Sequence, residues 1–330
     1  MKTYQCRCGN SLYFDSSYCV KCRCDVRMCP NCKSVAPIES RMDEVERCGN
    51  QQCGAKLRRC QNDVDFAACN RAIEADNSAT HCQYCLLNAV IPDLSVPENL
   101  TNWRKLEAAK HRVLAVVESL GFPVNNGPGI NPLLRFEFKS DAVELVSTGH
   151  ADGCITINLR EADSVEREKA RLKFHEPQRT LVGHFRHELG HYYWDVLVKS
   201  NHSEKFRQMF GDERNMDYET AKQSYYQNGP PDGWQKQFVS GYASMHPWED
   251  FAETFGAYLD MATVLQTARH FQILNLPKSE DNDLPSLLAN YADMGVAANE
   301  LNRDMGLIDL VPEVFMPSVV EKLGFIHTLR

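Results

Sequence analysis

The distribution of cysteine constrains the fold of this chain more than any other feature. Of its fourteen cysteines, thirteen lie between Cys6 and Cys85, in a chain of 330 residues. Two cysteines separated by two residues reach one ion from a single tight turn, so paired knuckles build a tetrahedral zinc site without a large apolar core. A reducing compartment favours metal thiolates over disulfides in such a segment. We therefore predict a metal-stabilised module over residues 1–90.

The spacing sorts the cysteines into three sets of four. These are Cys6, Cys8, Cys19 and Cys22; Cys29, Cys32, Cys48 and Cys53; and Cys60, Cys69, Cys82 and Cys85. Cys24 is an alternative to Cys22, and His81 is an alternative ligand in the third set. Cys154 lies in an apolar stretch typical of a small core residue. Closed four-thiolate sites leave no open coordination position, so we predict two or three structural zinc ions here.

The charge balance of the first 60 residues bears on nucleic-acid binding. They hold eleven basic and six acidic residues, a balance of +5 in a chain of net charge −8. Each four-cysteine zinc site adds −2, so two sites reduce that balance to +1. The basic patch that would attract a phosphate backbone largely disappears. Nucleic acid is therefore an alternative partner but not the favoured one.

The rest of the chain has the pattern of an α+β domain. Residues 91–100 contain two prolines and are predicted to be a linker, which leaves 101–330 as a second domain. Apolar spacing predicts a helix over 102–120, and short strands are predicted at 133–138, 142–146 and 154–159. From about residue 162 the pattern is almost wholly helical.

Neither a membrane span nor a secretion signal is visible in the sequence. No stretch approaches the roughly 18 uncharged apolar residues of a spanning helix, and Met1 is not followed by an apolar signal-peptide core. We expect a cytoplasmic protein with no membrane partner, and the sequence predicts no particular oligomeric state.

The strongest chemical signal is a His-Glu-x-x-His pentapeptide at residues 187–191. Four residues apart on a helix, His187 and His191 share one face and can place both imidazoles on one metal, while Glu188 can reach a water at that metal. Residues 181–198 contain no proline and are mostly apolar, as expected of the helix that carries such a pair.

A catalytic zinc needs a third protein ligand and one open position. Glu249 and Glu253 share a face of a predicted helix over 248–258, so one can bind the metal while the other holds a ligand histidine through its second ring nitrogen. Asp195 is a further candidate for such an outer contact. Candidate donors to a substrate oxyanion are Tyr242, His150 and His246, with Tyr242 the first choice.

These residues resemble a known family, the bacterial zinc-binding metallopeptidases that carry an N-terminal zinc ribbon. The similar stretches are 183–195 and 242–253, together with 6–22, 91–97, 149–153, 175–177 and 301–306. More distantly, Tyr242 with Glu249-x-x-Ala-Glu253 resembles a glutamate zincin. The resemblance implies a zincin-like α+β fold, zinc ligands His187, His191 and Glu249, general base Glu188 and electrophile Tyr242.

The sequence thus predicts a zinc-dependent metallopeptidase, an endopeptidase that acts on protein or peptide substrates with one catalytic zinc besides the structural ions. The alternative is an adaptor that binds nucleic acid or protein through its zinc ribbons and whose His-Glu-x-x-His site is not catalytic.

Overall fold

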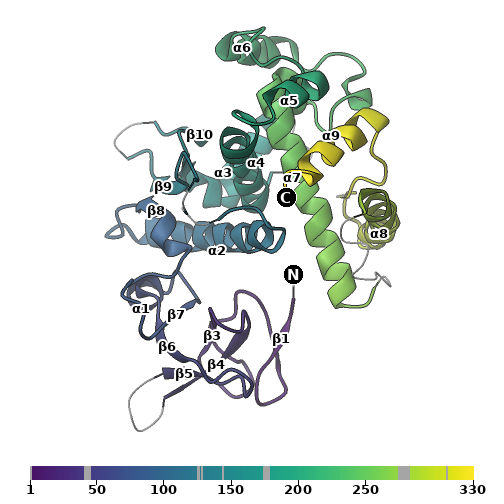
Figure 1. The fold of residues 1–330 in the computed structure, drawn as a ribbon. Coiled ribbons are helices and arrows are strands. Elements are labelled where there is room, and N and C mark those ends of the chain that lie inside the picture. Colours follow the sequence, from purple (N-terminus) through teal and green to yellow (C-terminus); the bar gives the residue numbers. More distant parts are fainter. Residues whose placement is uncertain are drawn as a thin grey trace. The chain divides into compact units, whose positions relative to one another are not determined.

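The computed structural model describes residues 2–40, 46–124, 127, 129–142, 145–173, 179–273, 283–309 and 311–330 (Figure 1). The chain divides into two compact units. The cysteine unit comprises Met1–Leu114, Arg135–Thr148 and Thr156–Lys169, and the histidine unit comprises Ala115–Leu134, Gly149–Ile155 and Ala170–Arg330. These units alternate along the chain.

Short strands form the first part of the cysteine unit. A hairpin of β1 (Tyr4–Gln5) and β2 (Ser11–Leu12) precedes an antiparallel five-stranded sheet. The sheet runs in sequence order through β3 (Val26–Met28), β4 (Val35–Ser40), β5 (Glu46–Cys48), β6 (Lys56–Arg59) and β7 (Ala72–Glu74). Helix α1 (Gln61–Phe66) joins the last two strands. This arrangement agrees with a zinc-ribbon-like module, in which knuckle turns connect short strands.

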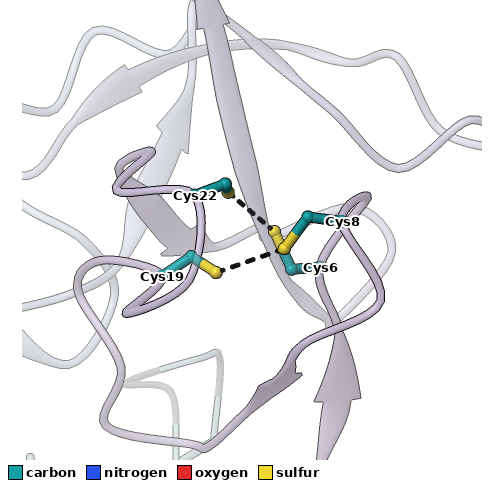
Figure 2. Close-up of side chains that lie close together, drawn as sticks. All are labelled: Cys6, Cys8, Cys19 and Cys22. Carbon is teal, nitrogen blue, oxygen red and sulfur yellow. Dashed lines mark hydrogen bonds between the residues drawn. The ribbon is translucent and has the colours of Figure 1, made fainter.

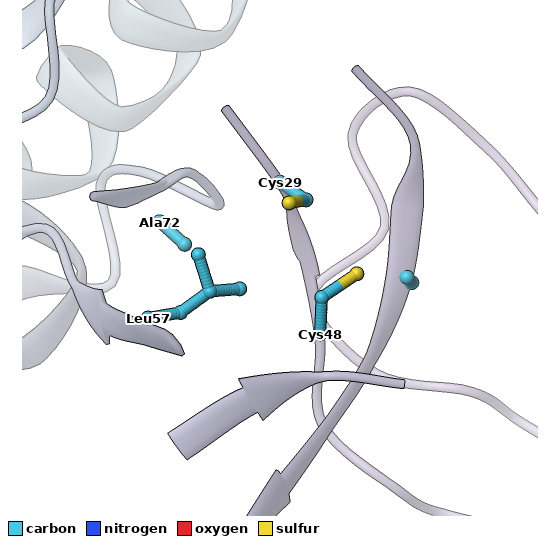
Figure 3. Packing of buried hydrophobic residues seen from close by; sticks show 5 residues of the cluster. Cys29, Cys48, Leu57 and Ala72 are labelled. Carbon is cyan, nitrogen blue, oxygen red and sulfur yellow. The ribbon is translucent and has the colours of Figure 1, made fainter. Parts of the chain in front are cut away.

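Part of the apolar core of this sheet contains cysteine side chains. One cluster of buried residues consists of Cys29, Ala36, Cys48, Leu57 and Ala72. Figure 3 shows Leu57 and Ala72 in this cluster with the Cys29 and Cys48 side chains. Ile38 packs against this cluster, and Val26, Met28 and Ile73 are buried elsewhere in the sheet. The cysteine side chains therefore belong to the core as well as to the metal clusters.

A second sheet and a long helix follow. After η1 (Cys85–Leu87), the strands β8 (Asn88–Val90), β9 (Arg135–Lys139), β10 (Gly149–Ala151) and β11 (Cys154–Asn158) form a sheet in the order β10-β11-β9-β8. Helix α2 (Pro97–Ser119) begins five residues before the predicted start, with proline in its first turn. Elements η2 (Leu159–Ala162) and α3 (Ser164–Lys173) complete this part.

The strand predicted at 142–146 differs from the structure. Residues 143 and 144 lie outside the described residues, and Ala142, Leu145 and Val146 are not in a strand. The Val146 amide donates to Asp141 Oδ1 at 2.8 Å. Because this amide is bonded to a side chain, it does not donate to the backbone of a neighbouring strand. The predicted strands at 133–138 and 154–159 correspond to β9 and β11.

The histidine unit is mainly helical, as the pattern after residue 162 predicts. Its elements are α4 (Leu181–Tyr193), the π-helical turn η3 (Trp194–Val198), α5 (Ser203–Phe210), α6 (Tyr218–Asn228), η4 (Trp234–Lys236), η5 (Tyr242–Met245), α7 (Pro247–His270), α8 (Leu284–Asp304) and α9 (Pro317–His327). Within the described ranges, no helix has the length and apolar character needed to cross a bilayer.

Helices α4 and α7 pack closely against each other and determine the geometry of the histidine unit. A Cβ atom on Gly190 would lie 2.7 Å from the Cα of Ala252, so only glycine fits at this crossing. The Thr180 hydroxyl caps α4 by accepting from the Gly183 amide at 2.9 Å, and His246 caps α7 before Pro247. Phe185, Phe251 and Phe255 are buried in the surrounding core, which is built largely of aromatic side chains.

Candidate metal centres

The two histidines of the pentapeptide meet a carboxylate from α7. His187 and His191 lie one turn apart on α4, and their Nε2 atoms are 3.1 Å apart. Glu249 Oε2, from the first turn of α7, lies 3.0 Å from His187 Nε2 and 3.4 Å from His191 Nε2. Ligands bound to zinc at about 2.0 to 2.1 Å in a tetrahedron lie roughly 3.3 Å apart. The three atoms thus have the spacing of one metal site.

The chemistry of these three atoms also fits a cation. Glu249 Oε2 is buried and accepts no hydrogen bond from the residues that the structure describes. An unsatisfied buried carboxylate oxygen is costly, and a metal ion would satisfy it. Two neutral imidazoles and one carboxylate are a common donor set for zinc. His187, His191 and Glu249 are therefore the residues that would hold the ion, as the resemblance implied.

Three outer contacts hold the donor atoms in place. Glu253 Oε1 lies 2.7 Å from His187 Nδ1, so this glutamate orients the imidazole from its far side. Ser240 Oγ donates to the other oxygen of Glu253 at 2.6 Å, and the Tyr218 hydroxyl donates to Glu249 Oε1 at 2.6 Å. The tyrosine thereby occupies one oxygen of Glu249 and leaves Oε2 facing the histidines.

Tyr218, Ser240 and Trp248 were not predicted. Tyr218 starts α6, 31 residues before Glu249, and only the fold brings the two together. The Trp248 ring lies against His191 with a centroid separation of 3.7 Å. The available sequence signal for Trp248 is its position next to Glu249, whereas neither Tyr218 nor Ser240 belongs to a recognisable motif.

The charges of this site shift its pKa values in opposite directions. Burial alone would lower the pKa of His187, but the neighbouring carboxylates of Glu249 and Glu253 outweigh it and raise that pKa well above its ordinary value. Burial would raise the pKa of Glu249, and the neighbouring His191 and His187 instead hold it well below the usual range. Without metal, a proton on His187 is thus stabilised between two carboxylates.

The predicted base and electrophile lie in the same region. Glu188 is buried on α4 beside His187. Tyr242 begins η5, and its ring centroid lies 6.0 Å from that of His187. Burial raises the pKa of Tyr242 and of Tyr218, so both hydroxyls stay protonated and remain donors.

The remaining candidates have contacts within the fold. His150 Nε2 accepts from the Gly153 amide at 3.2 Å, and burial with the nearby His191 lowers the pKa of His150 to about 3. His246 Nδ1 accepts from the Trp248 amide at 3.2 Å, while its Nε2 lies 3.1 Å from the Glu213 carbonyl oxygen. The Asp195 carboxylate lies 3.9 Å from His150 Nε2 and 3.4 Å from Lys199 Nζ. Their functional roles stay predictions.

A buried ion pair adjoins this site. Lys322 on α9 donates to Asp250 Oδ2 at 2.6 Å and to the Gln237 carbonyl oxygen at 2.8 Å. Asp250 follows Glu249 on α7, and the Gln237 carbonyl precedes Ser240 by three residues. This one ammonium group therefore joins α9 to the helix that supplies Glu249 and to the segment that supplies Ser240.

The cysteine unit contains three four-cysteine clusters with the predicted membership. In the first, Cys6 Sγ lies 3.6 Å from Cys22 Sγ and Cys8 Sγ lies 3.6 Å from Cys19 Sγ (Figure 2). In the second, the Cys29–Cys53 and Cys32–Cys48 sulfur pairs are each 3.8 Å apart. Four thiolates at about 2.3 Å from zinc would be separated by roughly 3.8 Å, so the clusters fit the ion.

The third cluster is the most enclosed. Cys60, Cys69, Cys82 and Cys85 are all buried, and Cys69 Sγ lies 3.8 Å from Cys82 Sγ. His81, the alternative ligand, instead places its Nδ1 atom 2.9 Å from Thr80 Oγ1. Cys85 Sγ also lies 3.6 Å from His111 Nε2 on α2, a contact that the spacing did not predict. Cys154 is half-buried in β11.

Two histidines on one helix and a glutamate from a later helix, in a chain that also carries thiol clusters, are typical of zinc-binding proteins. Comparison with known families leads to the same class. A family model described as "Putative zinc-binding metallo-peptidase" matches residues 99–329, and a zinc-ribbon domain model matches residues 3–96. The chain belongs to this metallopeptidase family and carries an N-terminal zinc-ribbon domain.

Relatives extend over the whole chain. Uncharacterized proteins of Mycobacterium tuberculosis strain H37Rv and of Mycobacterium bovis are each 35% identical to it over 341 residues. Each alignment covers 100% of this chain and 95% of the relative. No solved structure matches the chain.

Proposed function

We propose that this protein is a zinc-dependent endopeptidase of the glutamate-zincin type. The observation that carries the proposal is the convergence of His187 Nε2, His191 Nε2 and Glu249 Oε2 within 3.4 Å of one another, with Glu188 buried on the same helix. Three protein donors leave a fourth coordination position for water or substrate. Membership of the metallopeptidase family supports the same reaction.

Bound zinc would supply Lewis acidity, which polarises a peptide carbonyl and acidifies a water molecule. Glu188 would accept a proton from the attacking water and deliver it to the leaving amine. The Tyr242 hydroxyl, kept protonated by burial, would donate to the carbonyl oxygen as negative charge develops there. A donor of this kind lowers the barrier by about 3 kcal/mol. Glu253 and Tyr218 would keep the side chains of His187 and Glu249 oriented toward the ion during the whole reaction.

The position of β10 favours an extended peptide as substrate. This strand is at one edge of its sheet, and it carries His150, whose ring centroid lies 6.4 Å from that of His191. An edge strand can pair through its backbone with an extended peptide, and backbone pairing does not require a chain terminus. We therefore propose internal cleavage of a protein or peptide, with the cysteine unit recognising the substrate or a partner protein.

The decisive experiment compares Glu188→Gln with the wild type on casein, and counts zinc in both. We expect cleavage to fall by at least about a hundredfold in the variant, because it lacks the base, while zinc stoichiometry stays unchanged. Glu204→Gln is the matched control, since it makes the same change at an exposed position of α5 and should retain activity.

Metal analysis of His187→Ala gives a second measurement. A drop from about four zinc ions per chain in the wild type to about three would place one ion at the histidine site and three at the thiol clusters. Equal casein cleavage by the wild type and Glu188→Gln, with full zinc content, would overturn the proposal and leave the adaptor alternative.

A further inference from the structure

The first thiol cluster contains one more cysteine than a four-ligand ion requires. The sulfurs that lie within 4.8 Å of one another are those of Cys6, Cys8, Cys19 and Cys22. Cys24 Sγ lies 3.3 Å from Cys22 Sγ and 3.8 Å from Cys6 Sγ, so a fifth thiol touches this set. The two other clusters each consist of four cysteines. The extra thiol therefore distinguishes the first cluster.

The backbone holds this extra thiol beside one particular ligand. Cys22 and Cys24 flank Arg23, whose φ of 57° lies in the left-handed region. The Cys19 amide donates to the Cys24 carbonyl at 2.9 Å, and the Arg23 amide donates to the Cys19 carbonyl at 2.8 Å. These two bonds close a tight turn, which fixes the Cys22 and Cys24 sulfurs next to each other.

The same pair is also accessible to solvent. Cys22 is exposed and Cys24 is half-buried, whereas all four cysteines of the third cluster are buried. Oxidants in solution react with accessible thiolates and reach buried ones slowly. Exposure and an adjacent second thiol thus coincide at Cys22.

We propose that Cys22 and Cys24 form a peroxide-reactive thiol pair, and that joining them as a disulfide withdraws Cys22 from the first zinc site. The Cys22 thiolate attacks hydrogen peroxide, forming a sulfenic acid and releasing hydroxide. The Cys24 thiol then attacks the Cys22 sulfur, forming the disulfide and releasing water. The two sulfurs lose two electrons, and one peroxide is reduced to one water and one hydroxide, which takes a proton from the solvent to give a second water.

Oxidation would leave the first ion with Cys6, Cys8 and Cys19 only. These residues come from the β1–β2 hairpin and from the turn after it, so loss of the ion would release this hairpin from that turn. The second and third clusters would keep their ions, because neither has a fifth thiol within the contacts described above. The proposal is independent of peptidase activity at the histidine site.

The test treats the full zinc-loaded chain with a small excess of hydrogen peroxide. Zinc release is followed with a chromogenic chelator, and disulfides are mapped by mass spectrometry. We expect one zinc equivalent to be released in a fast phase, together with a Cys22–Cys24 disulfide. Dithiothreitol with added zinc should restore the original zinc content.

Cys24→Ser should retain the ion before treatment and release it at least about tenfold more slowly, since no neighbouring thiol completes the disulfide. Cys154→Ser is the matched control, because it removes the other cysteine outside the clusters and should release zinc like the wild type. Equally fast release from Cys24→Ser, a disulfide between other cysteines, or absence of the first ion from untreated Cys24→Ser would each overturn the proposal.

Discussion

The histidine site and the thiol clusters obtain their geometry in opposite ways. His187, His191 and Glu249 project from two long helices, α4 and α7, whose contact is filled by buried aromatic residues and by the close approach at Gly190. The cysteines project from turns between strands of two to six residues, and Cys29 and Cys48 pack in the same buried cluster as Leu57. The helix core positions the first site, whereas cysteines of the second set form part of the core around their own clusters.

This difference determines how much of the folding free energy of each unit depends on metal. Burying one large apolar side chain contributes about 1.5 to 3 kcal/mol, so several phenylalanines stabilise the helix pair without any ion. A structural zinc ion contributes about 10 to 16 kcal/mol to the folding of a small domain. Metal should therefore be a ligand of the histidine unit but a structural component of the cysteine unit.

Complete removal of zinc gives the largest expected effect. A strong chelator should abolish hydrogen-exchange protection of the amides in β3 to β7, because the thiol clusters hold those strands together. The amides of α4 and α7 should keep most of their protection. Hydrogen exchange followed by mass spectrometry measures both regions in one sample. Equal loss in the two regions would show that the proposed contrast between them is wrong.

Gly190→Ala tests whether the packing of α4 against α7 positions the zinc ligands. The added methyl would meet the Ala252 backbone, so we expect a destabilisation of about 1 to 3 kcal/mol and weaker zinc binding at the histidine site. Urea unfolding followed by tryptophan fluorescence gives the stability, and metal analysis gives the zinc content.

Gly256→Ala is the control on α7, where a Cβ atom would lie 3.9 Å from Arg186 Cβ. It should be neutral or stabilise by up to about 1 kcal/mol, because alanine is the better helix former. If the two variants behaved alike, the close approach at Gly190 would not determine the site.

The pH dependence of zinc binding at the histidine site should reflect the raised pKa of His187. Below that pKa the ion must displace a proton held between Glu249 and Glu253. Affinity should therefore fall as pH decreases, by up to about tenfold per pH unit, and the decline should begin above the ordinary histidine pKa of about 6.5. Competition with a chelator of known affinity measures the zinc affinity at each pH. The His187→Ala variant gives the contribution of the thiol clusters, which is subtracted.

Glu253→Gln provides the contrast for this pH measurement. It removes one of the charges that raise the pKa of His187, so the decline should begin at lower pH than in the wild type. An affinity that stayed constant down to pH 6.5 in the wild type would contradict the assigned direction of the shift.

Tyr218→Phe should have the smallest effect. Loss of the hydroxyl frees Glu249 Oε1 but leaves Oε2 facing the histidines, so we expect zinc affinity at this site to fall by about tenfold. Isothermal titration of the chain loaded at its thiol clusters measures the change. Tyr226→Phe is the control, since Tyr226 lies on the exposed face of the same helix. Equal zinc affinities for the two variants would show that the Tyr218 hydroxyl does not support zinc binding at this site.

Local patterns in the sequence predicted the parts of the molecule that depend on short-range spacing. The i, i+4 relation of His187 and His191 and the four-cysteine sets are such patterns, and the structure brings these residues together. The α+β class followed from the same kind of reasoning, because the short strands predicted up to residue 159 are followed by an almost wholly helical pattern.

Contacts between residues distant in sequence were not predictable in this way. Tyr218 reaches Glu249 only because α6 and α7 fold together, and His111 reaches Cys85 across 26 residues. The end of the helix at 181–198 was also missed, because the backbone changes to a π-helical turn at Trp194 while the apolar pattern continues. Tertiary packing decides these features, and a single sequence carries little signal of it.

The Lys322–Asp250 pair has a consequence for the order in which the protein matures during synthesis. Until the ribosome has released α9, the Asp250 carboxylate beside Glu249 has no ammonium partner, and burying it alone would cost several kcal/mol. The two central helices should therefore remain loosely associated on the nascent chain and close only when Lys322 emerges. Loading of the histidine site should therefore follow the emergence of Lys322, whereas the thiol clusters can acquire their ions earlier in translation.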